Sequence, residues 1–199
     1  MRYLLHGIKG RGQRKDRDRS GQALIEFVLP AVFLILLLFG LIDFAIAIYY
    51  RQVMINVSRE GSNLAARGAG DTQDAAISNA LDAVVASAGP LEIMGTVTNK
   101  GMGRVIISAV IKSNNATYWV VDQWAKGGLS SGDAPSKIHD GVGRIVVSKL
   151  PQTAGLPQVP AGHSTMYITE VYYRFKTASP LGKLVPFVIP TQLYDVAYF

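Results

Sequence analysis

Apolar residues are concentrated in one block near the N-terminus, which runs from Ala23 to Tyr50. Within this block, no charged residue occurs between Phe27 and Ile42. At a rise of ~1.5 Å per residue, a helix over residues 24–48 extends about 36 Å, enough to cross the ~30 Å hydrocarbon core of a bilayer. The pattern therefore predicts a transmembrane helix, which we assign to residues 22–51.

Both ends of the predicted helix carry recognisable signals. Pro30 is expected in its first turns, where a missing N–H is least damaging. Tyr49, Tyr50 and Arg51 close the apolar block, and aromatic and cationic side chains of this kind are typical of a membrane–water interface. Asp43 lies within two turns of this group, so we expect it either to reach the interface or to contact another subunit.

The helical pattern continues beyond the apolar block, with Gly61 as its weakest point, and should end at the run Gly68-Ala69-Gly70. Asp71 resembles the N-cap of a second helix, which Gly89-Pro90 ends. The apolar positions of this second helix recur at three- and four-residue spacing and predict one buried face: they are Ile77, Leu81, Val84 and Ala88.

The remainder of the chain has the alternation and composition of strands. We expect strands over residues 103–112, 116–124, 144–150, 165–175 and 191–199, with loops over 125–143 and 151–162. In the fourth strand, tyrosines share one face and Glu170 lies on the other, and we expect the tyrosines in the core rather than on a carbohydrate-binding surface. The predicted fold class is α+β: a long N-terminal transmembrane helix and a second helix packed on an antiparallel sheet.

The net charge of +6 is located almost entirely in the first 21 residues, where seven basic residues face two acidic ones, a net of +5. A nucleic-acid surface would need a basic face on the folded domain, so we expect no nucleic-acid binding. Basic residues ahead of an apolar segment hold that end of the chain in the cytoplasm. We therefore expect a basic leader over 1–21, without regular structure, and an extracytoplasmic domain over 52–199.

Several kinds of chemistry find no support in the sequence. The absence of cysteine excludes disulfides and thiol catalysis. His6, His139 and His163 lack the spacing of metal ligands, and neither a phosphate-binding loop nor a nucleophile elbow occurs. We expect no cofactor, no metal site and no enzymatic activity.

The junction between the leader and the apolar block carries the most informative residues. Gly21 lies at the junction, and Glu26 is the fifth residue after it, inside the apolar run. A carboxylate within a membrane helix costs about 2.5–3.5 kcal/mol on insertion scales, so it indicates a function by default. Cleavage after Gly21 would create an α-amino group on Gln22, which could pair with the Glu26 of a neighbouring subunit. The alternative is that Glu26 is an ordinary acid at the cytoplasmic end of an anchor.

A glycine followed by glutamate at the fifth position, after a basic leader, resembles the prepilin-peptidase site of type IV pilin-like proteins. Three further segments resemble TadE-like minor pseudopilins of the tight-adherence (Flp) pilus: Gly40-Leu41-Ile42-Asp43-Phe44, Tyr50-Arg51-Gln52 and Arg59-Glu60-Gly61. The tail, with Ser179-Pro180-Leu181 and Val185-Pro186, is more weakly similar. One departure is Phe27, where Flp-type sites usually have tyrosine.

The resemblance implies a structural subunit, processed between Gly21 and Gln22, with Glu26 and Phe27 in assembly. Its implied partners are prepilin peptidase, other pilin and pseudopilin subunits, the inner-membrane assembly platform and membrane lipid. Its implied location is the bacterial cytoplasmic membrane, crossed once, with possible incorporation into an extracellular pilus. The alternative is a secreted or anchored binding module with a conventional signal, for which Ala45-Ile46-Ala47 offers a small-x-small cleavage site.

Overall fold

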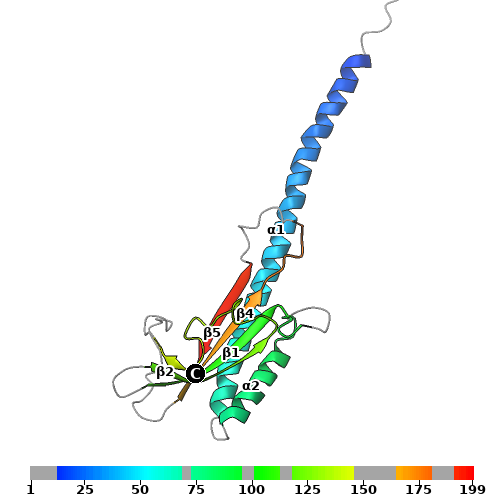
Figure 1. Cartoon of the computed structure of the whole chain (residues 1–199). Coiled ribbons are helices and arrows are strands. Elements are labelled where there is room, and N and C mark those ends of the chain that lie inside the picture. The colour runs from blue at the N-terminus through cyan, green and yellow to red at the C-terminus, as the bar shows by residue number, and fades with distance from the viewer. Residues whose placement is uncertain (1–12, 69–72, 96–100, 113–117, 146–164, 181–190) are drawn as a thin grey trace, which may run out of the picture.

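A single long helix carries a small α+β head at one end (Figure 1). The computed structural model describes residues 13–68, 73–95, 101–112, 118–145, 165–180 and 191–199. Helix α1 (Gln13–Arg67) is followed by α2 (Gln73–Ser87). Five strands complete the head: β1 (Gly103–Lys112), β2 (Tyr118–Gly127), β3 (Gly143–Arg144), β4 (Thr165–Arg174) and β5 (Gln192–Tyr198). The predicted α+β fold is confirmed.

Helix α1 begins earlier than the sequence pattern indicates. The expectation that the leader lacks regular structure is wrong for residues 13–21, which belong to α1. This stretch contains no proline and is rich in Gln, Arg and Lys, which are good helix formers, so it extends the apolar helix at little cost. As a result Pro30 lies inside the helix rather than in its first turns. The end of α1 at Arg67 agrees with the prediction.

The sheet is antiparallel throughout, in the order β3-β2-β1-β4-β5. The long strand β1 occupies the centre, with Val105 paired to Val171 of β4 on one side and to Lys126 of β2 on the other. A register shift between Ala109 and Val110 marks a bulge in the β1–β2 pair. Strand β3 is much shorter than predicted, and residues 146–150 of that prediction lie outside the described part.

Both helices pack on the same face of the sheet and form the main core with it. Met54, Val57 and Ala65 of α1 are buried there, and the four positions predicted for the buried face of α2 are all buried as well. Tyr167 and Tyr173 of β4 point into this core, which confirms that the tyrosine-rich strand is part of the core. Asp71, the expected N-cap, lies outside the described residues.

The other face of the sheet is covered by the segment between β2 and β3, which the sequence predicts as a plain loop. Its apolar side chains Leu129, Ala134 and Ile138 are buried against the sheet. Strand β4 is therefore buried on both faces, and Glu170 is 0% exposed. The Glu170 carboxylate accepts hydrogen bonds from the Ser136 hydroxyl, from the backbone N–H of Lys137 (2.9 Å) and from the Tyr194 hydroxyl (2.9 Å).

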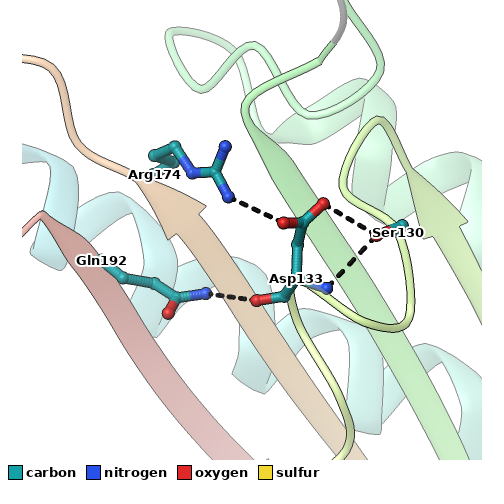
Figure 2. A network of polar contacts seen from close by, with 4 residues as sticks. All are labelled: Ser130, Asp133, Arg174 and Gln192. Atoms are coloured by element: carbon teal, nitrogen blue, oxygen red, sulfur yellow. Dashed lines mark hydrogen bonds and ion pairs between the residues drawn. The ribbon is translucent and has the colours of Figure 1, made fainter.

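A second polar network fixes the same loop at its other end (Figure 2). Asp133 accepts a hydrogen bond from the Ser130 hydroxyl (2.7 Å) and forms an ion pair with Arg174 of β4 (3.2 Å). Its backbone carbonyl accepts a hydrogen bond from the Gln192 side chain in β5. The Ser130 hydroxyl and the Arg174 guanidinium together lower the pKa of the Asp133 carboxyl. The loop is thus tied to both β4 and β5.

Gly61 is a point of close approach between α1 and β4. A Cβ added there would lie 2.8 Å from Cγ2 and 3.0 Å from Oγ1 of Thr169 in β4. Such distances require the Thr169 side chain, the helix or the strand to shift. A glycine inside a helix costs roughly 1 kcal/mol relative to alanine, so its presence here is explained by the packing it permits.

We predict that Gly61→Ala destabilises the head even though it raises helix propensity. Overpacking of a tight contact costs about 1–3 kcal/mol, which outweighs the propensity gain. Thermal unfolding of the full chain in detergent, followed by near-ultraviolet circular dichroism of the head aromatics, measures the change. Thr169→Ala should restore part of the loss in the double variant. Gly40→Ala is the control, because an added Cβ there meets nothing within 4 Å. Equal melting temperatures for Gly61→Ala and Gly40→Ala would contradict the proposed contact.

Candidate functional site

The first part of α1 extends away from the head as a free apolar segment, residues 21–42 (Figure 1). The most apolar 18-residue window of α1 has a mean hydropathy of 2.8 and is only 6% buried. The apolar core helix of a soluble protein would be mostly buried instead. At ~1.5 Å per residue, the segment extends about 32 Å, close to the ~30 Å of a hydrocarbon core. This geometry is consistent with a single-pass membrane anchor.

Gly21 has no packing role in this chain, since an added Cβ would meet nothing within 4 Å. This contrasts with Gly61, whose missing side chain is explained by Thr169. Gly21 also lies inside a helix, where glycine is a poor choice unless something else requires it. The fold of the chain therefore gives no reason for a glycine at this position.

Glu26 is exposed on the free apolar segment, where one intramolecular contact is present. The side-chain amide of Gln22 donates a hydrogen bond to Oε1 of Glu26 at 3.1 Å. Gln22, the predicted first residue after cleavage, and Glu26 are thus neighbours on one helix face. Phe27 beside them is 74% exposed.

Pro30 adds a second acceptor next to the Glu26 carboxylate. In a regular helix, the N–H of residue 30 would donate to the carbonyl of Glu26, four residues earlier. Proline has no N–H, so this carbonyl loses its helical partner. In a hydrocarbon environment both a carboxylate and a carbonyl without a partner are costly. Glu26 is therefore a site with unused acceptor capacity inside an otherwise apolar surface.

In contrast to Glu26, the Asp43 carboxylate finds its hydrogen-bond donors within its own chain. Its side chain is 0% exposed. Oδ1 accepts hydrogen bonds from the backbone N–H groups of Ala178 and Ser179, both at 3.0 Å, and Oδ2 accepts one from the Ser179 hydroxyl. We call this group of three residues the Asp43 latch. It joins the free apolar segment to the stretch that follows β4.

The predicted interfacial group divides between two environments. Tyr49 and Arg51 are exposed, as expected of an interfacial belt. Tyr50 instead turns into the head, where its ring lies edge-on to Tyr173 (5.3 Å between centroids) and Phe175 (5.9 Å). The contacts between α1 and the head therefore begin at Asp43, earlier in the sequence than the predicted boundary at residue 51.

Sequence reasoning singled out Asp43 but not its partners. Ser179 could have been found, because it lies in the tail segment that resembles the TadE-like family, as Asp43 does in the N-terminal one. Nδ1 of His139 lies 3.3 Å from the carbonyl oxygen of Gly141, to which it can donate a hydrogen bond, and His6 and His163 lie outside the described residues. Among the described residues, no group of three or more His, Asp or Glu side chains is placed to hold a metal ion.

We predict that Asp43→Leu destabilises the head much more than Asp43→Asn. Leucine leaves two N–H groups and a hydroxyl without an acceptor, at about 1–3 kcal/mol for each buried group, whereas asparagine retains one acceptor oxygen. Thermal unfolding and hydrogen exchange at the Ala178 and Ser179 amides test this in the full chain. Glu60→Leu, an exposed acid on the same helix, is the control. Unchanged exchange at both amides in Asp43→Leu would rule the latch out.

The comparison with known families finds its match in the same segment of α1. Residues 21–63 match the model of the family described as TadE-like protein. No curated protein and no solved structure shows a significant match. The match begins at Gly21, includes Glu26, Asp43 and the interfacial group, and ends two residues after Gly61. It confirms the resemblance predicted from the sequence: residues 21–63 make this chain similar to TadE-like proteins and associate it with the Tad pilus system.

Proposed function

We propose that this protein is a minor pseudopilin of a Tad (Flp) pilus, made as a precursor that prepilin peptidase cleaves between Gly21 and Gln22. The observation that carries the proposal is the exposed Glu26 with unused acceptor capacity, five residues after a glycine that the fold does not need. Both residues fall within the TadE-like match. In this proposal other pilin and pseudopilin subunits and the inner-membrane assembly platform are the partners, and the head lies outside the cytoplasmic membrane.

Cleavage at this position requires the helix to open locally, because a protease binds extended backbone. Gly21 favours this opening, since glycine destabilises a helix by roughly 1 kcal/mol relative to alanine. Its missing side chain also leaves the backbone accessible to another protein. The same residue thus serves both requirements, and neither concerns packing within the chain.

The alternative with a conventional signal sequence is less compatible with the contacts of α1. Cleavage after Ala47 would fall where Ile46 and Ala47 pack against the core of the head. It would also remove Asp43 from Ala178 and Ser179, leaving these donors without their acceptor. These contacts favour a helix that stays attached to the head, as a membrane anchor or assembly segment does.

Assembly in this proposal is a charge-neutralising contact between subunits. The α-amino group of a cleaved Gln22 carries three N–H donors and a positive charge, and Glu26 of a neighbour offers a carboxylate and a freed carbonyl. In their pair the two charges would neutralise each other within the hydrocarbon environment, where each alone is costly. The exposed apolar side chains that flank Glu26 would pack against the neighbouring helix at the same time.

We predict that Gly21→Phe blocks processing and leaves membrane insertion and folding intact. An added Cβ there meets nothing within 4 Å, so we expect the effect to arise in the complex with the peptidase. N-terminal sequencing and gel mobility of the membrane-bound protein report cleavage. Gly21→Ala, with its small side chain, should still be processed, and Gly40→Phe is the control for a ring added to the same helix. A Gly21→Phe protein that still begins at Gln22 would refute this cleavage site.

We predict that Glu26→Gln inserts and is cleaved but fails to associate with partner subunits. Removing one member of a desolvated ion pair costs about 3–5 kcal/mol, which is roughly two to three decades in an association constant. Pull-down of the partner subunits at matched expression measures this loss. Glu60→Gln, on the exposed face of the same helix, should leave recovery unchanged, and Asp43→Asn should have a much milder effect than Glu26→Gln. Normal recovery with Glu26→Gln would return Glu26 to the role of an ordinary acid in an anchor.

A further inference from the structure

A mixed polar and aromatic cavity of about 470 Å³ lies on the side of the head nearest the free apolar segment. Its volume falls in the range of small-molecule sites. Four segments that are distant in sequence contribute its walls: Tyr50 from α1, Glu92 from the turn after α2, Met102 just before β1, and Tyr173 with the nearby stretch from Lys176 to Ala178. None of these residues enters the proposed assembly mechanism.

The cavity is located at the level of lipid headgroups. Ala178 belongs both to its wall and to the Asp43 latch, and the latch marks the end of the free apolar segment. If residues 21–42 fill the hydrocarbon core, the headgroup layer extends roughly 5–8 Å beyond Asp43. Tyr50 lies about 10 Å above Asp43 along the helix, and helical side chains lean back toward the N-terminus. Its ring therefore reaches into this layer.

The cavity presents groups of opposite charge together with aromatic faces. Glu92 and Lys176 are both exposed, and within the described part of the chain neither belongs to an ion pair. Glu92 and Tyr173 both line the cavity. Burial raises the pKa of Tyr173 to about 12, and the neighbouring Tyr50 and the negative charge of Glu92 add to the rise. Tyr50 and Tyr173 provide rings that attract cations. The lining thus suits a ligand with a cation and an anion a short distance apart.

We propose that this cavity binds the zwitterionic phosphoethanolamine headgroup of a phospholipid in the leaflet next to the head. The ammonium group is held by the Glu92 carboxylate and the two tyrosine rings, and the phosphate by the Lys176 ammonium. The acyl chains extend down beside the apolar side chains of the free segment. The inference rests on the membrane-anchor part of the proposed function, but not on cleavage at Gly21 or pairing at Glu26.

A bound lipid would hold the head at a fixed height. The latch joins the head to the helix, and the lipid would join the head to the bilayer surface at nearly the same level. A free zwitterion of the same chemistry could also enter the cavity from solution. What favours the lipid is the position of the cavity directly above the apolar segment, which places any lipid headgroup there at high local concentration.

The test is native mass spectrometry of the purified full chain, released from nanodiscs that contain equal amounts of phosphatidylethanolamine and phosphatidylglycerol. The first lipid carries the ammonium and the second lacks it. We expect the ethanolamine lipid to be retained about fivefold over the glycerol lipid, a ratio that corresponds to about 1 kcal/mol. Glu92→Gln should bring this ratio close to one, and Lys176→Gln should reduce the retention of both lipids.

Two charge-matched variants outside the cavity complete the experiment. Asp140→Asn and Arg144→Gln each remove one exposed charge and should leave the ratio unchanged. Equal retention of both lipids by the wild type, or a ratio that Glu92→Gln does not alter, would overturn the proposal. Displacement of the lipid by an equal concentration of free phosphoethanolamine would overturn the lipid as ligand. Because no pilus component is present, the result does not depend on whether Glu26→Gln disrupts assembly.

Discussion

The burial of the Asp43 carboxylate at the end of a bare apolar helix is the interaction on which the arrangement of the whole molecule depends. Without donors, an acid at this position would be costly either in lipid or in the core. Ala178 and Ser179 supply three donors, which makes the acid a specific attachment point for the stretch after β4. The head is thereby fixed at one height on α1, and residues 21–42 are left almost entirely exposed.

This fixed height also determines the depth of Glu26. The two acids are separated by about 25 Å along the helix, so with Asp43 at one edge of a ~30 Å core, Glu26 lies about one turn inside the other. Asp43 is satisfied within its own chain. Among the side chains that the structure describes, Glu26 has only the amide of Gln22, and it lies beside a carbonyl that Pro30 leaves without a helical donor. Of two acidic residues in one helix, Asp43 therefore completes the fold and Glu26 requires a partner.

Local sequence patterns predicted those helices and strands that are determined by residues close together in the sequence. The spacing of Ile77, Leu81 and Val84 identified the buried face of α2, and the alternation over 103–112 identified β1, because one neighbouring surface decides each pattern. The loop between β2 and β3 was not recognised as a cover of the sheet, since its anchors Glu170 and Arg174 lie more than thirty residues away. The partners of Asp43 were missed for the same reason. The resemblance located the residues of the candidate site, but only the three-dimensional contacts separated Glu26 from Asp43.

Contacts within the chain account for the identity of some residues of α1 and leave others without a reason inside the chain. Those others point to interactions with other molecules. Gly61 is explained by Thr169, Tyr50 by Tyr173 and Asp43 by Ser179, so the fold alone accounts for their identity. Gly21 and Gly40 meet nothing that an added Cβ would disturb, and Glu26 and Phe27 are exposed in a surface that otherwise suits lipid. A helix that only anchored the head would gain stability from alanine at both glycines and from leucine at Glu26. That it carries the costlier residues, at positions within the TadE-like match, is the physical reason to regard this segment of α1 as a surface for contact with other proteins.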